Sequence, residues 1–394
     1  MVTWILATVN VIGLVLVAVM YEAQRRQLGS QEPAVDAFFP PVSVLKPLKG
    51  VDPALEQNLE SFFHLDFPEY EILFGVNDPR DPAVAVARRV IARHPMVRAR
   101  LVIAGELVGF NPKVNNLAGI LPHARHELLL ISDSNVAVDR CMLRHMVARM
   151  SDANVGLVTS FIRGVDGQGL GGALESLQLN TFVMGGVAAV SGPPGQVCAV
   201  GKSMLLRRAD LERFGGFAEL GRFLAEDQVC AEKIRELGRE VVVCPHPIDN
   251  VLGQITVRGF ASRHLRWARI RRHISLPGYL GELLTNPLAM AAGLLAVAPG
   301  AGSTALAVTT FVIVCATSVA AERRLGVRRS LIFYPMLVLI RAVAVAALWP
   351  VPLVSSSVSW RGRRFRITEG TRLVPDHAEE VGDVSGLQTE EAAA

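Results

Sequence analysis

The chain has 394 residues, which leaves room for one sizeable catalytic domain and accessory segments. Hydrophobic residues make up 51% of it but aromatic residues only 6%, an aliphatic excess that is unusual for a soluble globular protein. The formal net charge of +4 is modest, and the basic residues gather beside the apolar segments, which indicates lipid head groups and argues against nucleic acid as a partner. The five cysteines show no C-x-x-C spacing, so neither a zinc site nor a disulfide framework is indicated.

The chain begins with an apolar segment. Residues 4–20 contain no charged residue, and we expect residues 1–21 to form a membrane anchor. The segment has no basic n-region and no small-residue cleavage signature, so we expect it to remain in the protein. Arg25 and Arg26 then mark the cytoplasmic side. Residues 22–41 are polar and contain proline, which is typical of a linker.

From residue 42 onward, short β-branched runs alternate with helix-like stretches. Strands are expected at residues 42–45, 70–76, 100–103 and 127–131, and helices at 53–63 and 83–93. This alternation predicts βαβ units and a largely parallel sheet. We therefore expect residues 42–256 to form an α/β domain.

Two of these strands are each followed by an aspartate, and a third aspartate stands at the start of a helix. Asp78 and Asp133 each follow an expected strand, and Asp227 begins an expected helix. Ligands bind at the carboxyl ends of strands in open α/β sheets, so the three side chains are candidates for one site. Taken singly, an aspartate after a strand is more often a turn residue, and Asp227 beside Glu226 could simply favour the start of a helix.

The chemistry of a sugar nucleotide offers a role for two of these carboxylates. A diphosphate is bound together with a divalent cation, whose protein ligands are carboxylate oxygens, and Asp133 could supply such a ligand. The attacking group would be an alcohol, which must lose its proton to a base within hydrogen-bond reach. Asp227 is the candidate for that base.

A basic stretch follows the α/β domain. Residues 257–280 are expected to form an amphipathic helix at the membrane interface, and this helix carries the sequence Arg263-His264-Leu265-Arg266-Trp267. Its arginines could bind lipid phosphates, as basic interfacial helices commonly do, or the diphosphate of a leaving nucleotide.

The next region, residues 281–356, is apolar and is expected to lie in the membrane. Residues 283–321 are interrupted by Pro299 and Gly300 and are long enough for two short crossings. The arginines at residues 323–329 would then lie in the cytoplasm.

The second part of this apolar region admits two arrangements. Residues 331–354 could cross the membrane once, or could form a re-entrant hairpin that turns at residues 350–352, and the hairpin is favoured because it keeps the following basic residues inside. Arg341 is costly in lipid and is expected to face protein, water or a head group, and snorkelling is favoured over a role in substrate binding. Residues 357–394 are expected to form a cytosolic basic segment and a disordered acidic tail.

Four ordered elements resemble the D, D, D, (Q/R)-x-x-R-W signature of membrane glycosyltransferases: Asp78, Asp133, Asp227 and Arg263-x-x-Arg266-Trp267. Three more motifs resemble ceramide glucosyltransferases, namely SVLKPLKGVDP at residues 43–53, GFNPKVNNL at 109–117 and WRG at 360–362. The resemblance covers residues 42–367. It departs at residues 181–191, which lack the histidine that animal ceramide glucosyltransferases carry there, so the acceptor is less firmly implied than the donor chemistry.

This resemblance implies a fold and an activity. The fold would be a GT-A-type, Rossmann-like catalytic domain in the cytoplasm, with N-terminal and C-terminal transmembrane helices in a bacterial inner membrane. The activity would be transfer of glucose from UDP-glucose to the hydroxyl of the membrane lipid ceramide, with inversion at the anomeric carbon, to give glucosylceramide. The implied cofactor is Mg²⁺ or Mn²⁺.

The resemblance also implies roles for single residues. Asp227 would be the catalytic base, Asp133 would bind the metal and the diphosphate, and Asp78 would contact the uridine. The donor-binding residues would be Asp78, Lys113, Asp133, Arg263, Arg266 and Trp267, the last three of which would also hold the leaving group and the acceptor region. Lys113 has an alternative interpretation of equal weight, because residues 113–116 could be only a turn with an asparagine cap before a helix.

Three rival interpretations remain open. The acceptor could be a hopanoid or another lipid with a different UDP-sugar, although Asn111-Pro112-Lys113 favours ceramide. A processive polysaccharide synthase would share the aspartate and arginine pattern, but it needs more membrane crossings than this chain offers. A catalytically inactive membrane scaffold or sugar-nucleotide sensor is disfavoured because Asp133 and Asp227 are both present.

Overall fold

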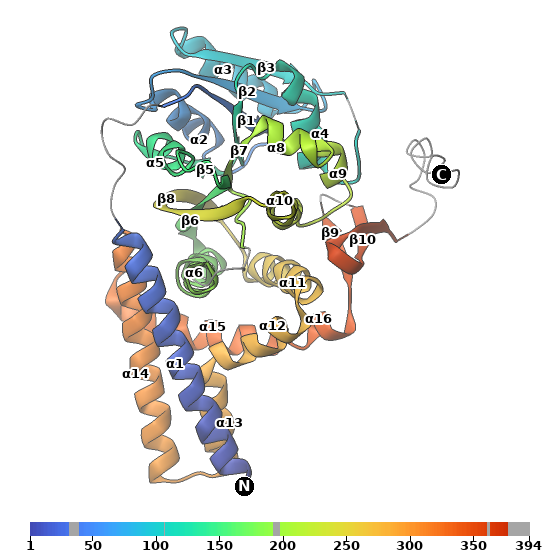
Figure 1. Cartoon of the computed structure of the whole chain (residues 1–394). Helices are drawn as coiled ribbons and strands as arrows, with labels where there is room; N and C mark the ends of the chain where they lie inside the picture. The colour runs from blue at the N-terminus through green and yellow to red at the C-terminus, as the bar shows by residue number, and fades with distance from the viewer. Residues whose placement is uncertain (31–38, 106, 192–197, 361–362, 377–394) are drawn as a thin grey trace.

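A mixed β-sheet forms the centre of the catalytic part of the protein (Figure 1). The computed structural model describes residues 1–30, 39–105, 107–191, 198–360 and 363–376. Residues 31–38 of the expected linker, residues 361–362 of the WRG motif and residues 377–394 of the expected tail lie outside these ranges. Residues 22–28, which were expected to belong to the linker, are helical and continue the N-terminal helix. Within them, eight strands pair in the order β3-β2-β1-β4-β7-β6-β8-β5. The strands are β1 (Val42–Pro47), β2 (Tyr70–Val76), β3 (Arg98–Ile103), β4 (Leu128–Ser132), β5 (Val136–Ala137), β6 (Val155–Gln168), β7 (Ser203–Arg207) and β8 (Glu240–Gln254).

The directions of the strands follow the prediction in part. Strands β3, β2, β1 and β4 are parallel neighbours, as the βαβ rhythm predicted, and β6 is parallel to β8. Strand β7 instead runs antiparallel to both β4 and β6, and β5 runs antiparallel to β8. The residue pattern predicts that a segment is a buried strand but does not set its direction, so the sequence could not show that β7 returns beside β4.

Two apolar cores cover the two faces of the sheet. Alternate residues of one strand point to opposite faces, so Val44 joins one core and Leu45 the other. The larger core includes apolar residues of helices α2 (Leu55–Ser61), α3 (Ala83–Arg93), α5 (Met142–Arg149) and α6 (Gly169–Gln178). The second core includes residues of α4 (Pro112–Ile120), α8 (Arg208–Arg213), α9 (Gly216–Leu220) and α10 (Glu226–Glu236). Burial on both faces explains why β1, β2 and β4 are almost continuously apolar.

Below the sheet domain, three helices run side by side away from it: α1 (Val2–Leu28), α13 (Pro287–Val297) and α14 (Ala301–Arg324) (Figure 1). The side chain of Trp4 on α1 is 77% exposed, as expected of a residue that faces lipid. Asn10 is fully buried in this bundle, where its Nδ2 donates to Pro287 O at 2.7 Å and its Oδ1 accepts from Thr310 Oγ1 at 3.0 Å. Internal polar contacts of this kind hold helices together in an apolar medium.

Three helices in the described part of the chain are long and apolar enough to cross a membrane: Val2–Leu28, Ala301–Arg324 and Leu331–Val354. A fourth candidate is the pair Leu276–Thr285 and Pro287–Val297, which is bent by 66°. The chain breaks between α13 and α14 at Pro299 and Gly300, where the sequence predicted a turn.

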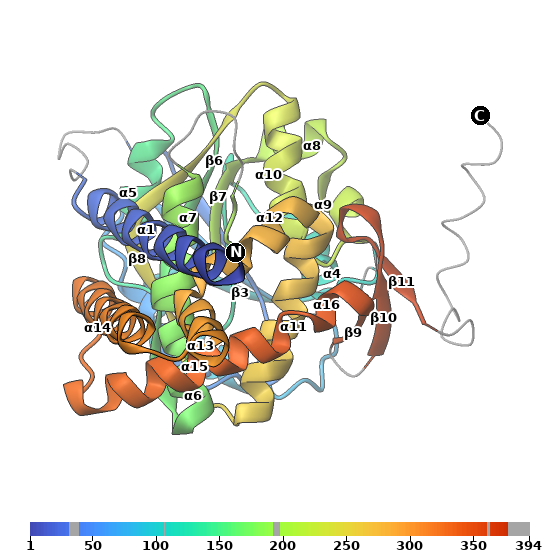
Figure 2. The same ribbon diagram turned by 90° about the horizontal axis from the view of Figure 1, so that it is seen from below.

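The last apolar region differs from the expected hairpin. Helix α15 (Tyr334–Leu348) continues into the short α16 (Val351–Val354) and does not fold back at Pro350. It runs at a steep angle to α1 and α14 and passes beneath α6 and α11 (Val257–Ile274) (Figures 1 and 2). The chain therefore returns to the side of the sheet domain without the predicted turn.

A small antiparallel sheet follows α16 and packs on the catalytic part. Its strands are β9 (Ser357–Trp360), β10 (Arg363–Ile367) and β11 (Leu373–Pro375). Leu224 lies in a small core with Phe365, and Leu224 N donates to Thr371 O at 3.0 Å. The C-terminal segment, predicted only as basic, thus supports the stretch that leads into α10.

Candidate functional site

The candidate site lies where the carboxyl end of β4 meets the start of β7. Asp133 directly follows β4, and the antiparallel pairing of Ser132 with Ser203 brings Lys202 beside it. Lys202 Nζ lies 3.0 Å from Asp133 Oδ2. Lys46, at the end of the neighbouring β1, donates from its Nζ to Asp133 O at 3.0 Å. Two lysines from different strands therefore hold the aspartate that the sequence predicted as metal ligand.

Lys113 joins this group from the first turn of α4. Asn111 caps the helix, since its side chain accepts from Lys113 N and Val114 N, and its Nδ2 also donates to Glu226 Oε2 at 3.1 Å. The Lys113 ammonium lies 2.9 Å from both Asp133 Oδ1 and Glu226 Oε1. The expected turn at residues 113–116 is not found, because these residues lie within α4 and the cap is Asn111. The assignment of Lys113 to the donor pocket stays a prediction.

The charge of Lys113 is stabilised by its surroundings. Burial disfavours its charged form, but Asp133, Glu226 and Asp227 outweigh this effect and raise the pKa of Lys113. The same reasoning applies to Asp133, where burial opposes ionisation and Lys113 and Lys202 together lower its pKa below the ordinary value. Asp133 is therefore ionised at neutral pH.

Asp227 lies in the first turn of α10, beside Glu226. Its Oδ2 accepts from Gly201 N at 2.8 Å and its Oδ1 accepts from Gln228 N at 2.9 Å. Burial, and then the neighbouring charge of Glu226, raise the pKa of Asp227 to about 6, while Lys113 acts in the opposite direction. A carboxylate with a pKa near neutrality is suited to take a proton from an alcohol in the reaction.

Gly201 permits the close approach of the backbone to Asp227. A Cβ atom at this position would lie 2.7 Å from Asp227 Oδ2, closer than real Cβ contacts occur. Glycine is therefore required here for the amide to donate to the carboxylate. Gly201 O also accepts from Lys113 Nζ at 2.9 Å, so one peptide segment contacts both the predicted base and the central lysine.

The chemistry of Asp133 fits a divalent cation. Its Oδ1 is buried and, among the described residues, accepts no hydrogen bond, although the Lys113 ammonium lies nearby as an ion pair. A buried, ionised carboxylate oxygen with free acceptor capacity is a ligand of the kind that Mg²⁺ and Mn²⁺ prefer.

The arginine helix approaches the site through Glu175 of α6. Glu175 is buried, and its Oε1 lies 4.0 Å from Arg263 Nε on α11. Burial raises the pKa of Glu175, and the positive charges of Arg263, Arg266 and Lys202 all counteract that rise. Glu175 thus lies within electrostatic reach of both arginines of the R-x-x-R-W sequence and of a lysine that contacts Asp133.

One face of α11 is buried against the protein. Phe260, His264 and Ala268 are buried, at a spacing of four residues, whereas Val257 is 48% exposed. Trp267 is partly buried and packs against the larger core. The helix is therefore fixed to the protein along the 260–264–268 face, and its position at the membrane interface stays a prediction.

Asp78 stands apart from the other predicted residues. It follows β2, whose carboxyl end lies at the same edge of the sheet as that of β4, but its side chain is 53% exposed. Its Oδ1 accepts from Arg80 N at 2.8 Å. In the described structure it forms no contact with Asp133 or Asp227, so its assignment to the uridine remains a prediction.

Three further residues of this region were missed by sequence reasoning. Lys46 is fully buried, and its ammonium lies 3.6 Å from the centre of the Phe62 ring. Lys202 and Glu175 are joined to the site only through pairing of β4 with β7 and packing of α6 against α11. The one available signal was the position of Lys46 within the SVLKPLKGVDP motif, since a lysine at the end of a buried strand needs an anionic or polar partner.

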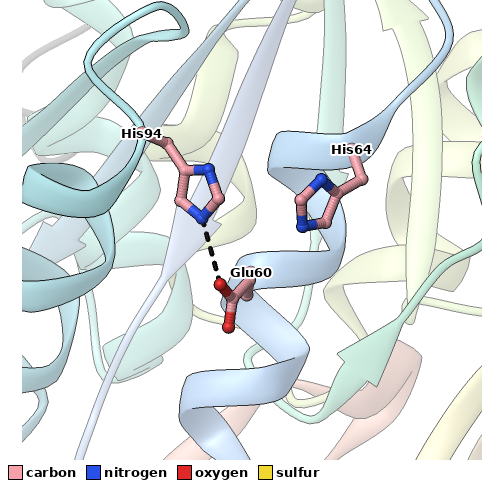
Figure 3. A group of neighbouring side chains, drawn as sticks. All are labelled: Glu60, His64 and His94. Carbon is pink, nitrogen blue, oxygen red and sulfur yellow. Dashed lines mark hydrogen bonds and ion pairs between the residues drawn. The ribbon is translucent and has the colours of Figure 1, made fainter.

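A separate group of side chains could hold a metal ion. Within the described residues, the ligand atoms of Glu60, His64 and His94 lie within 4.8 Å of one another (Figure 3). Glu60 Oε1 lies 3.1 Å from His94 Nε2. These residues stand at the ends of α2, η1 (Phe62–His64) and α3 that lead into β2 and β3, at the edge of the sheet opposite to Asp133. The group is therefore separate from the candidate site.

Comparison with known sequences relates the chain to lipid glycosyltransferases. Residues 5–373 match the sequence profile of the family described as Glycosyl transferase family 21. Ceramide glucosyltransferase 1 of Caenorhabditis elegans is 33% identical over 291 residues, which are 73% of this chain and 62% of that protein. Ceramide glucosyltransferase 3 of the same organism is 31% identical over 261 residues, which are 65% of this chain and 57% of that protein. The chain thus spans less than two thirds of these relatives.

Among solved structures, the mannosyltransferase PcManGT from Pyrobaculum calidifontis, in complex with GDP-Man and Mn²⁺, has a similar fold. The TM-score is 0.54 at 19% sequence identity, over 88% of this chain and 98% of that one. This likeness concerns the fold alone. It confirms the predicted glycosyltransferase α/β fold of the GT-A type, with apolar helices at both termini.

Proposed function

The chain belongs to glycosyl transferase family 21, and from this premise we propose that it transfers glucose from UDP-glucose to the primary hydroxyl of ceramide, with inversion at the anomeric carbon. The relatives reported above, which are named ceramide glucosyltransferases, support the choice of donor sugar and acceptor. The observation that carries the proposal is the junction of Asp133, Lys113, Glu226 and Asp227, which supplies an ionised carboxylate, a cation and a base of raised pKa in one place.

The proposed reaction assigns the proton to Asp227. The acceptor hydroxyl gives its proton to the Asp227 carboxylate while its oxygen forms a bond to the anomeric carbon of the sugar. The bond from that carbon to the UDP oxygen breaks at the same time, and UDP leaves with the electron pair. Gly201 N and Gln228 N keep the carboxylate oriented, because each donates to one of its oxygens.

The remaining charged residues would hold the donor and its leaving group. Asp133 would be the ligand of a Mg²⁺ or Mn²⁺ ion, which when bound neutralises charge on the diphosphate. Lys113, which lies beside Asp133, would stabilise the negative charge that develops on the diphosphate as UDP leaves. We assign binding of the leaving UDP to Arg263 and Arg266. Both arginines act electrostatically on Glu175, and so does Lys202, which contacts Asp133, so the arginines lie near the proposed diphosphate site.

The proposed arrangement in the membrane follows from the charge distribution. Arg25 and Arg26 end α1, and Arg323 and Arg324 end α14, next to the sheet domain. Because basic residues remain on the cytoplasmic side, we propose that the sheet domain is cytoplasmic. A lipid acceptor would keep its chains in the bilayer and present its hydroxyl at the cytoplasmic membrane surface, next to the sheet domain.

The test is product identification with full-length protein in detergent. UDP-glucose, UDP-galactose, UDP-glucuronate and UDP-N-acetylglucosamine are each offered with ceramide or with a hopanoid polyol, and the products are identified by mass. We expect glucosylceramide from wild type. Asp227→Asn should reduce turnover on the order of 1,000-fold, the middle of the range for loss of a general base, while UDP still binds.

The matched control is Glu236→Gln, because Glu236 is an exposed carboxylate on the same helix α10 whose side chain pairs only locally with Lys233. It should retain wild-type turnover. Formation of a glycosylated hopanoid in place of glucosylceramide would refute the acceptor, and undiminished turnover of Asp227→Asn would remove this residue from the mechanism.

A further inference from the structure

A small, partly open cavity lies directly beneath the sheet domain. It is lined by α1, α14, α15 and the π-helical turn η3 (Leu179–Val183) that follows α6. Its polar lining consists mainly of Tyr21, Gln24, Thr181, Thr317, Ser318 and Arg341, and the remainder is mostly apolar. A space with hydroxyl groups and one cation on an apolar wall is suited to an amphipathic molecule.

The cavity lies at the level where lipid head groups are found. On α1 its lining extends from Val17 to Gln24, directly before Arg25 and Arg26. On α14 it extends from Val314 to Ala321, directly before Arg323 and Arg324. Both stretches belong to the ends of the helices nearest the sheet domain (Figure 1). Arginines at the end of a spanning helix mark the interface, so the cavity opens just inside it.

Arg341 is the one charged residue that lines this cavity. Its Nη1 donates to Gln178 Oε1 at 3.3 Å and to Thr181 Oγ1 at 3.2 Å. Its Nε is buried and lacks a hydrogen-bond partner within the described structure, where no carboxylate pairs with it either. The side chain thus donates to residues of α6 and η3. The sequence had favoured snorkelling toward the head groups, which this orientation contradicts.

An arginine in this position requires a compensating partner. A cation in a membrane segment that meets neither a carboxylate nor bulk water is costly, and such residues commonly face a substrate path. Arg341 lines the cavity, and its Nε has no hydrogen-bond partner among the described residues, so a ligand with acceptor oxygens would satisfy it. A lipid phosphate is usually held by several basic residues together, whereas this cavity offers one cation among hydroxyl groups. A neutral head with amide and hydroxyl oxygens fits this lining better.

The cavity adjoins the candidate site through α6. Phe182 and Thr285 line both this cavity and a second, smaller one, which Gln178 and His264 also line. His264 is next to Arg263, the arginine that approaches Glu175. Glu175 itself lies one turn before Gln178 on α6. One helix therefore carries a residue of the candidate site and, a turn later, the partner of Arg341.

We propose that this cavity binds the polar head of the acceptor lipid and that Arg341 is the residue that positions it, through donation to its amide and hydroxyl oxygens. The inference rests on the proposed function, because it takes the acceptor to be a neutral sphingolipid. It adds the place where the acceptor enters, between α1 and α14, and a residue that selects it.

The kinetic test varies a short-chain ceramide in mixed micelles with full-length protein. For Arg341→Gln we expect the acceptor KM to rise roughly tenfold, equivalent to about 1.4 kcal/mol, while the KM for UDP-glucose and the Kd for UDP stay unchanged. Arg341→Lys keeps the charge but loses the planar guanidinium group, so its acceptor KM should lie between those of wild type and Arg341→Gln. Thr317→Phe, which fills the cavity from α14, should raise the acceptor KM as well and provides an independent variant if loss of Arg341 impairs folding.

The matched control is Arg323→Gln. Arg323 is an exposed cation in the last turn of α14 that does not line the cavity. It should leave the acceptor KM at the wild-type value. The inference is overturned if both Arg341→Gln and Thr317→Phe keep a normal acceptor KM, or if Arg341→Gln weakens UDP binding by the same factor.

A binding measurement separates this inference from the proposed function. A ceramide with a photoreactive acyl chain is cross-linked to wild type, and phosphatidylglycerol with the same chains is added as competitor. We expect cross-linked peptides from the segments around Met20 and Thr317, with little competition. Equal competition would identify a phospholipid site and overturn the inference. Labelling of these segments without synthesis of glucosylceramide would support lipid binding in the cavity but refute the proposed function.

Discussion

The Lys113 ammonium lies 2.9 Å from Asp133 Oδ1, although the two residues come from the first turn of α4 and the end of β4. Lys113 is equally close to Glu226 Oε1, at the start of α10. A single cation therefore joins the predicted metal ligand to the segment that carries the predicted base. The electrostatics of this junction lead to specific expectations.

The activity should depend on the ionisation of Asp227. A base whose pKa is raised to about 6 is ionised above that pH and protonated below it, so kcat/KM should be level above about pH 7 and fall about tenfold per unit at low pH. UDP binding measured over the same range serves as the control. A profile that stays level down to about pH 5 would contradict the role of Asp227.

Removal of the charge of Lys113 should shift this profile. Lys113 lowers the pKa of Asp227, so in Lys113→Gln the fall in activity should begin at a higher pH, and UDP should bind more weakly. Lys113→Arg should restore the position of the profile in large part, because it keeps the positive charge. The control is Lys233→Gln on α10, where the lysine pairs only with Glu236. An unshifted midpoint in Lys113→Gln would separate this lysine from the base.

A methyl group at residue 201 should disturb Asp227 without unfolding the protein. In Gly201→Ala the new Cβ would collide with Asp227 Oδ2, and a base displaced by about 1 Å can lose on the order of 100-fold in turnover. Because the collision is local, the melting temperature should change little. Gly293→Ala is the matched control, since a Cβ there meets nothing within 4 Å. Equal turnover in the two variants would show that the close approach is unimportant.

Removal of divalent metal should abolish donor binding that depends on Asp133. We expect EDTA to abolish transfer and added Mn²⁺ or Mg²⁺ to restore it, and we expect calorimetry to show that metal no longer tightens UDP binding in Asp133→Asn. His94→Ala is the control, because the group of Glu60, His64 and His94 lies at the opposite edge of the sheet. Loss of metal dependence in the control but not in Asp133→Asn would reverse the assignment.

The ordered motifs of the chain were sufficient to predict the family and the fold. The three aspartates and the R-x-x-R-W sequence stand in the order of the signature, and the alternation of buried strands and helices predicted the α/β domain that the comparisons confirm. These features are local in sequence, since a strand is recognised by its own residues and a motif by its own spacing. The roles of the single site residues remain predictions.

The neighbours of the predicted residues were not predictable in the same way. Lys202 reaches Asp133 because β7 runs antiparallel to β4, and Glu175 reaches Arg263 because α6 packs on α11. Neither relationship leaves a periodic or spaced pattern in the chain. The inward orientation of Arg341 likewise depends on the position of α15 beneath α6, whereas its sequence context favoured snorkelling.

The sequence by itself determined the family, the α/β class and the apolar segments, because strand burial, motif order and hydropathy are properties of contiguous residues. The tertiary structure alone decided which polar groups meet: three lysines around one aspartate, a glycine amide that donates to the predicted base, and an arginine that lines a cavity between helices. The physical reason is that an ion pair or a cavity depends on distances between segments far apart in the chain, and strand direction and helix packing set those distances.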